Sequence, residues 1–208
     1  MAQLTFTQFL TLDGVYQGPG GPDEDRSGGF EHGGWLVPFA DDDMGRFVNE
    51  VFDRAGAFLF GRRTYDIFAS YWPRVTDEDD PIASRLNHLP KYVVSRTLRH
   101  ADWEGSTIVG GGDDAVAAEV ARLKEEQPEG ELQIHGSATL ARSLLARDLI
   151  DVCHLLVYPV AVGQGQRLFQ DLPLPTAFEL ADHRTTAAGV AIHSYRPAGR
   201  ATFGTIGA

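Results

Sequence analysis

Short apolar runs and amphipathic stretches alternate along the chain up to Ile150. Over residues 42–55 the apolar side chains recur at helical spacing, and Asp41 precedes them as a potential N-cap. The apolar face of this predicted helix consists of Met44, Phe47, Val48, Val51 and Ala55. Short apolar runs predict strands at 3–10, 57–60, 91–95, 106–109 and 132–135. Amphipathic stretches predict further helices at 64–72, 81–89, 114–126 and 138–147.

The pattern is β-like after Ile150, where three successive segments read VCHLLVYPVAV, AFELADHRT and VAIHSYRP. Alternating strands and helices followed by antiparallel strands predict one three-layer α/β domain over residues 1–208. Its mixed sheet should have a mostly parallel centre, flanking helices and antiparallel C-terminal strands.

Composition narrows the possible functions. The 208 residues are 43% apolar and 23% charged, and a net charge of −11 argues against nucleic-acid binding. Cys153 is the sole cysteine, which excludes an internal disulfide and a cysteine-based zinc site, and no spacing such as His-x-x-x-His predicts a metal. The N-terminus lacks a signal-peptide pattern, and no apolar run approaches the roughly 20 residues of a membrane span. We therefore expect a cytoplasmic protein with no membrane partner.

The stretch VGGGDDA (residues 109–115) has the spacing of a dinucleotide-binding fingerprint between a strand and a helix. However, Asp113 and Asp114 would occupy the helix N-terminus where a pyrophosphate has to bind, and they would repel it. The acidic residue expected at the end of the next strand is also missing. We interpret the stretch as a capped helix after a glycine-rich turn.

A second candidate for phosphate binding is GAFLFGRRTYDIF (residues 56–68). Gly61 permits a tight turn, and the following helix has no acid before Asp66, so its free N–H groups lie beside Arg62 and Arg63. This arrangement suits a pyrophosphate together with a ribose phosphate. Taken alone, the motif fits two solvent-facing arginines equally well.

The stretch IHGSATLARSLL (residues 134–145) repeats this design, because Gly136 and Ser137 follow a strand and no acid occurs before Asp148. Two such helix N-termini can face one crevice at the carboxyl edge of a parallel sheet. The alternative for this stretch is a plain turn in which Ser137 caps the helix.

Together these segments resemble the dihydrofolate reductase-like superfamily, most closely the reductase half of the bifunctional riboflavin-biosynthesis deaminase–reductase and its stand-alone bacterial relatives. The resemblance rests on FTQFLTLDGVYQGP, FLFGRRTYDIF, KYVVSRTL and LQIHGSATLARSLLARDLIDVCHLLVYPVAVGQGQRLF, in this order. It implies an NADPH-dependent reductase that transfers hydride to a small nitrogen heterocycle, such as a riboflavin-pathway pyrimidine, a pteridine or a flavin. The alternative is a non-catalytic protein that binds a nucleotide or small aromatic ligand on the same fold.

The resemblance also implies where the ligands bind. The residues expected at NADPH are Gly61, Arg62, Arg63, Thr64, Ser95, Arg96, Thr97, Gly136, Ser137, Ala138 and Thr139. Those expected at the substrate are Asp13, Gly14 and Trp35. No catalytic residue emerges, and Asp13 is equally interpretable as a turn residue.

Two departures from the folate enzymes bear on the substrate. The Met44–Gly45 neighbourhood offers no carboxylate for a pteridine ring, which argues against folate, and His135 replaces the first of three glycines at the cofactor turn. The zinc-binding deaminase half of the riboflavin enzyme is not found in these 208 residues, so we expect a stand-alone reductase.

Three further expectations concern larger features. A preformed crevice should separate the ends of strands 57–60 and 132–135, with Trp35 and Asp13 on its rim. The glycine-, proline- and acid-rich loop at residues 17–34 should be mobile and should close over the substrate. The apolar run HLLVYPVAV exceeds what one sheet face must bury, and with the resemblance it predicts a homodimer.

Overall fold

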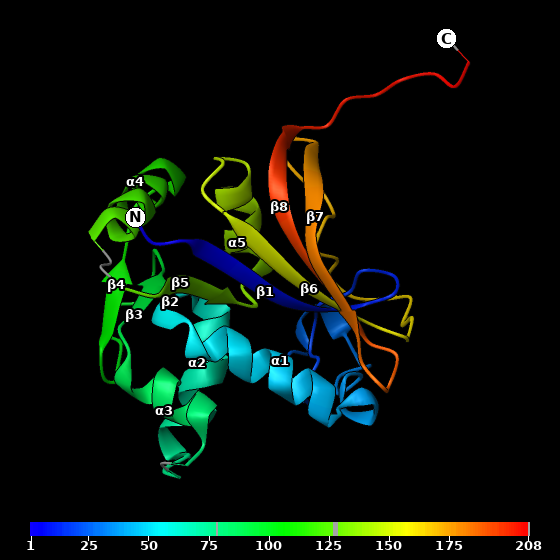
Figure 1. Cartoon of the computed structure of the whole chain (residues 1–208). Coiled ribbons are helices and arrows are strands. Elements are labelled where there is room, and N and C mark those ends of the chain that lie inside the picture. Colours follow the sequence, from blue (N-terminus) through cyan, green and yellow to red (C-terminus); the bar gives the residue numbers. More distant parts are fainter. Residues whose placement is uncertain (78, 127–128, 208) are drawn as a thin grey trace.

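A single eight-stranded sheet runs through the computed structural model, which describes residues 1–77, 79–126 and 129–207 (Figure 1). The strands are β1 (Leu4–Thr11), β2 (Ala55–Gly61), β3 (Lys91–Val94), β4 (Ser106–Val109), β5 (Glu131–His135), β6 (Val152–Tyr158), β7 (Thr176–Thr185) and β8 (Ala191–Arg200). Their order across the sheet is β4-β3-β2-β5-β1-β6-β8-β7. Pairs from β4 to β6 are parallel, whereas β6–β8 and β8–β7 are antiparallel, which confirms the predicted mixed sheet.

Helices cover both faces of the sheet. They are α1 (Asp42–Asp53), α2 (Arg62–Tyr71), α3 (Pro81–His88), α4 (Asp113–Glu126) and α5 (Ala138–Leu145), with short 3-10 turns at Ser27–Gly29, Val37–Phe39 and Trp72–Arg74. In Figure 1, α1, α2 and α3 lie on one side of the sheet, and α4 and α5 on the other. No helix among the described residues is long and apolar enough to cross a membrane.

Strand β2 shows how the sequence builds these three layers. Ala57 and Leu59 belong to the core beneath α4 and α5, whereas Phe58 and Phe60 belong to the core beneath α2 and α3. Because successive side chains point to opposite faces, a strand covered on both sides must be apolar throughout.

Several helix ends differ from the predictions by one or two residues, and two of these differences move residues of the sheet or of the candidate site. Ala55, expected on the apolar face of the first helix, begins β2 instead, where it pairs with Glu131. The second helix begins at Arg62 rather than at residue 64, because Gly61 is extended (φ −73°, ψ 158°) and the backbone becomes helical directly after it. Both arginines therefore belong to the first turn of α2.

Strand β6 explains the apolar run on which the homodimer was predicted. It lies between β1 and β8, and nearly all its residues are buried within the chain itself. Phe47 and Val51 of α1 belong to the same buried cluster as Leu156 and Tyr158. The hydrophobicity of this strand is therefore accounted for without a second copy.

Candidate active site

The turns after β2 and β5 contact each other at the carboxyl edge of the sheet. The Gly61 N–H donates to Ser137 Oγ (2.9 Å), and the Ser137 N–H donates to Thr64 Oγ1 (3.1 Å). Strands β2 and β5 are neighbours and parallel, so both turns leave the same edge. The structure thus brings together two segments that were predicted to face one crevice.

Helices α2 and α5 both begin at this contact with open N-termini. Neither has a side chain that caps its N–H groups, and neither has an acidic residue in its first turn. Ser137 does not cap α5, since its hydroxyl accepts from Gly61 instead. Unpaired N–H groups and the positive end of the helix dipole converge here, which favours an anion.

The other long helices begin with acids. Asp41 accepts from the Met44 N–H at the start of α1, and Asp80 accepts from two N–H groups at the start of α3. Helix α4 carries Asp113 and Asp114 in its first turn, as expected for the Gly-rich stretch. The contrast distinguishes structurally capped helices from the two that are open to a ligand.

The turn after β5 has an unusual backbone. Gly136 (φ 62°) and Ser137 (φ 54°) are both left-handed, and a Cβ on Gly136 would lie 3.4 Å from Thr64 Oγ1. The side chain of His135 does not crowd this turn, because its ring stacks on Phe52 of α1 (centroids 4.3 Å apart). The turn is held against the start of α2, since the Ser137 N–H donates to Thr64 Oγ1.

The two arginines after β2 make different contacts. Arg62 Nε contacts both carboxylate oxygens of Asp66 at 2.7 and 2.8 Å, one turn along the same helix. Arg63 instead reaches the 17–34 loop, where it contacts Asp25 (3.2 Å) and the Ser27 hydroxyl (3.1 Å). Both side chains remain more than 40% exposed, so both are accessible to a ligand.

The segment after β3 lies at the same edge. Gly61 and Val94 are paired in the sheet, so residues 95–97 follow directly beside the α2 turn. Ser95 Oγ accepts from the N–H groups of Thr97 (3.3 Å) and Leu98 (3.0 Å). Ser95 and Arg96 line a shallow depression that also includes Gly110 and Gly111, so the Gly-rich stretch contributes surface but not a helix N-terminus.

An enclosed cavity of about 220 Å³ lies between α1, α2 and the sheet. Its walls are mostly apolar, and its polar lining comes from β1, the β5 turn and the 17–34 loop. The lining residues are Thr7, Gln8, Phe9, Tyr16, Gln17, Gly18, Pro19, Glu24, Asp25, Val48, Val51, Phe52, Thr64, Ile67, Phe68, Trp72, Ile82, His135, Gly136 and Ser137. Because Thr64, Gly136 and Ser137 belong to the two turns and also line the cavity, the cavity and the turns form one continuous site.

Asp13 and Trp35, predicted for the rim, are not among these lining residues. The Asp13 carboxylate accepts from Thr11 Oγ1 (2.7 Å) and the Gly163 N–H (2.9 Å), and it pairs with Arg167 (3.2 Å). Desolvation opposes ionisation, but the hydrogen bond from Thr11 and those from backbone N–H groups lower its pKa to about 2. These contacts fit the interpretation of Asp13 as a turn residue rather than as a substrate ligand. Gly14, beside it in the turn, has a φ of 78°.

Trp35 is 6% exposed, and its indole N–H donates to the Gln17 carbonyl (2.8 Å). Its ring packs edge-on against Tyr158 of β6. The 17–34 loop is anchored here and at Phe30, which is also buried. Trp35 thus holds the start of the loop that lines the cavity, while mobility of the loop stays a prediction.

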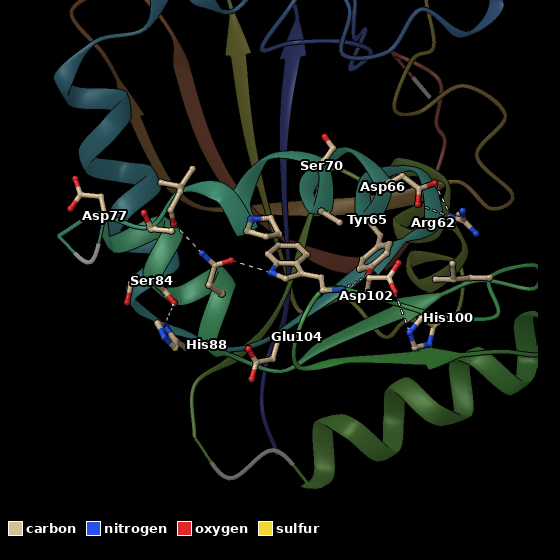
Figure 2. Close-up of a pocket in the computed structure, with 17 residues that line it drawn as sticks. Arg62, Tyr65, Asp66, Ser70, Asp77, Ser84, His88, His100, Asp102 and Glu104 are labelled. Atoms are coloured by element: carbon tan, nitrogen blue, oxygen red, sulfur yellow. Dashed lines mark hydrogen bonds and ion pairs between the residues drawn. The ribbon is translucent and has the colours of Figure 1, made fainter.

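A larger and more open groove of about 820 Å³ lies elsewhere, between α2, α3 and the segment at 98–104 (Figure 2). Trp103 is one of its lining residues, and it donates its indole N–H to Asn87 Oδ1 (3.0 Å) and its backbone N–H to the Tyr65 hydroxyl (3.2 Å). Of the predicted site residues only Arg62 lines it. Three predicted site residues, Thr64, Gly136 and Ser137, line the smaller cavity instead.

Glu24, Asp25 and Gln8 are lining residues that the sequence reasoning missed. Gln8 had a signal, because it is a polar residue inside an apolar strand. The acids of the loop had none, since several occur in succession and only the tertiary structure shows which of them reach the cavity. In the described part of the chain, no group of three or more His, Cys, Asp or Glu side chains is placed to hold a metal ion.

Comparison with known proteins relates this site to one family. The family model described as the RibD C-terminal domain matches residues 2–192. The uncharacterized protein YyaP of Bacillus subtilis (strain 168) is 28% identical over 185 residues, which are 87% of each protein.

Solved structures share the fold at low sequence identity. A putative riboflavin biosynthesis protein from Shewanella sp. PV-4 has a TM-score of 0.68 at 22% identity, covering 95% of this chain and 99% of that one. The diaminohydroxyphosphoribosylaminopyrimidine deaminase/5-amino-6-(5-phosphoribosylamino)uracil reductase of Thermotoga maritima has a TM-score of 0.61 at 15% identity, covering 94% of this chain and 56% of that one. Dihydrofolate reductase from Enterococcus faecalis, complexed with NADP(H), has a TM-score of 0.54 at 14% identity, covering 94% and 96%. The fold is therefore dihydrofolate reductase-like, as predicted.

Proposed function

Since the chain belongs to the RibD C-terminal domain family, we propose that it is an NADPH-dependent reductase that transfers hydride to a small nitrogen heterocycle. One observation carries the proposal from the structure: the open N-termini of α2 and α5 meet beside two arginines and an enclosed, mostly apolar cavity. Those donors fit the pyrophosphate and the ribose phosphate of NADPH, and the cavity fits the reacting ring.

Each cofactor-binding residue has a proposed role. The N–H groups at the starts of α2 and α5 would hold the pyrophosphate, with Thr64 and Ser137 keeping the two turns together. Arg62 and Arg63 would hold the 2′-phosphate, and the segment after β3 would lie along the adenosine. The full set is Gly61, Arg62, Arg63, Thr64, Ser95, Arg96, Thr97, Gly136, Ser137, Ala138 and Thr139.

NADPH supplies the hydride when it is bound, and the protein supplies binding, orientation and the exclusion of water. The apolar walls from α1 and α2 would keep water from the reacting ring. Glu24 and Asp25 of the 17–34 loop line the cavity, and the contact between Asp25 and Arg63 links the loop to the proposed phosphate site. No lining residue is assigned as the proton donor.

A non-catalytic ligand-binding protein on the same fold is the alternative. The observation that favours it is the apolar character of α1 at the cavity, where Val48, Val51 and Phe52 supply no carboxylate. Steady oxidation of NADPH in the presence of a panel of heterocycles would support the reductase, whereas binding without turnover would support the alternative.

The preference for NADPH over NADH tests the role of the arginines. Hydrogen bonds to charged groups contribute on the order of 1.5–3 kcal/mol, so Arg62→Ala or Arg63→Ala should weaken NADPH binding by roughly ten- to a hundredfold. NADH binding should barely change, because NADH lacks the 2′-phosphate. Isothermal titration of each variant with each cofactor at fixed ionic strength measures the difference.

Arg74→Ala provides the matched control, since Arg74 is exposed on the turn after α2 and lies outside the proposed site. It removes the same charge and should leave both cofactors unaffected. Equal and small losses for NADPH and NADH in the Arg62 and Arg63 variants would contradict the proposal and leave two solvated surface cations.

A further inference from the structure

The charged side chains that line the cavity are carboxylates, and its other polar side chains are hydroxyls, amides and one imidazole. Glu24 and Asp25 contribute carboxylates, and none of the described residues that line the cavity is a lysine or an arginine. Arg63 is outside the lining and is already paired with Asp25. A ligand in this cavity meets negative charge and no cation.

Of these two carboxylates, Glu24 has no counter-ion among the described residues, whereas Asp25 pairs with Arg63. Its Oε2 accepts from the Gly20 N–H (2.5 Å), which fixes the side chain against the loop backbone. Burial raises the pKa of Glu24, although the N–H groups of Gly20 and Gly21 act in the opposite direction. A half-buried carboxylate of this kind is stabilised by a ligand that donates hydrogen bonds to it.

A chain of side chains fixes the tautomer of His135. Gln133 Nε2 donates to the Val51 carbonyl (2.6 Å) and to Glu131 Oε2 (2.9 Å), both of which can only accept. Gln133 Oε1 must therefore face His135 Nε2, 3.0 Å away, and that nitrogen must carry the proton. The other ring nitrogen, Nδ1, is then an acceptor.

His135 also stays neutral, because burial and the nearby His154 lower its pKa to about 3. Gln8 adds a further acceptor, since its Oε1 is buried without a hydrogen-bond partner in a residue that lines the same cavity. The Glu24 carboxylate thus calls for N–H groups on the ligand, and the neutral His135, which also lines the cavity, adds no positive charge.

We propose that this cavity takes an unphosphorylated, uncharged or cationic heterocycle that presents N–H groups to Glu24, and that it rejects a ring bearing a phosphate. The inference rests on the proposed function and narrows its substrate. It separates this chain from the Thermotoga maritima protein, whose named substrate carries a phosphoribosyl group. The physical reason is that a phosphate dianion beside the Glu24 carboxylate, in a cavity with no lysine or arginine among its described lining residues, loses its hydration without compensation.

Two matched pairs of compounds test the proposal: 5-amino-6-(ribitylamino)uracil with its 5′-phosphate, and 6-hydroxymethylpterin with its monophosphate. Isothermal titration of the full chain, with and without NADPH, should show at least one unphosphorylated ring binding tenfold or more tightly than its phosphate ester. A phosphate ester that binds as tightly as its parent overturns the proposal, and so does the failure of both unphosphorylated rings to bind.

Glu24→Gln keeps the shape of the side chain and its contact with Gly20 but removes the charge. The variant should bind the unphosphorylated ring about fivefold or more weakly, because a neutral acceptor forms weaker hydrogen bonds than a carboxylate. It should also discriminate less against the phosphate ester. Asp23→Asn is the control, since Asp23 is 81% exposed, pairs with Arg26 and does not line the cavity. Equal responses of the two variants would contradict a specific role for Glu24.

Failure of the proposed function is distinguishable from failure of this inference. NADPH titration of the wild-type chain reports on the cofactor site alone. A chain that binds no NADPH but still prefers unphosphorylated rings would refute the reductase and leave the ring specificity in place.

Discussion

At the scale of single residues, two buried histidines flank Thr7 in the sheet. Thr7 of β1 is paired with His135 of β5 on one side and with His154 of β6 on the other. Burial is the main cause that lowers both pKa values, to about 3 for His135 and about 4 for His154. Each histidine is therefore neutral in the folded protein at neutral pH, whereas in the unfolded chain it titrates near its usual pKa of about 6.5.

The stability of the protein should consequently fall in mild acid. Below pH 6.5 the unfolded chain binds protons at these histidines and the folded chain does not, so the free energy of unfolding decreases as pH falls toward the folded pKa values. Each histidine should account for a loss of about 2 kcal/mol between pH 7.5 and pH 5. Urea unfolding at both pH values measures this loss.

His154→Asn isolates one of the two contributions. Asparagine can replace the contact of His154 Nδ1 with Ser194 Oγ (2.8 Å), while His154 Nε2 has no partner to lose. The variant should lose less stability than wild type over the same pH interval, whatever its absolute stability. The same decrease in both proteins would show that His154 does not contribute.

At the scale of elements, helix ends are completed in different ways according to what they face. Aspartates complete the N-termini of α1 and α3, and a buried lysine completes the C-terminus of α3. Lys91 Nζ donates to the carbonyls of Leu86 (2.8 Å), Asn87 (3.2 Å) and Leu89 (2.9 Å). The ammonium also lies 4.8 Å from the centre of the Trp103 ring.

Lys91→Met should therefore destabilise the protein although methionine is more hydrophobic. It removes the donor for three carbonyls at a buried helix end and leaves them unsatisfied, at a cost of about 2–4 kcal/mol. Urea unfolding at pH 7 measures the change, with the exposed Arg99→Met as the control for removing a cation. A loss no greater than that of the control would show that water replaces the lysine.

At the scale of the whole molecule, the sheet ends in an unpaired strand. Among the described residues, β7 pairs with β8 alone, and its residues from Glu179 to Thr185 are exposed. Leu180 is 49% exposed on this strand, close in sequence to the exposed Leu174. Such an edge can pair with another chain, although charged residues along it oppose non-specific pairing.

The homodimer stays a prediction, and β7 is now the place where we expect it to form. Light scattering at micromolar concentration should report about twice the 22.7 kDa of one chain. Leu180→Asp should shift the population toward the monomer, because it places a charge in the expected contact. A wild-type monomer under these conditions would refute the dimer.

What the sequence determined by itself depends on neighbours along the chain. The periods of apolar residues predicted every strand and helix of the parallel half, because each period reports directly on the faces that an element buries. Asp41 and the two acids at 113–114 were recognised as helix-start residues, since capping involves only the next few residues. The turns at Gly61 and Gly136 were recognised for the same reason, and so was the lack of a carboxylate at Met44 and Gly45.

The tertiary structure decided what depends on residues distant in sequence. Gly61 and Ser137 are 76 positions apart, and their hydrogen bond exists because β5, late in the chain, inserts between β2 and β1. The same insertion sets the tautomer of His135 through Gln133 and α1, and the packing of the loop on the core puts Glu24 in the cavity and Trp35 outside it. The spacing of apolar residues shows which face of a strand is buried but not which strands are neighbours. The residues that make up the site are therefore known only from the tertiary structure.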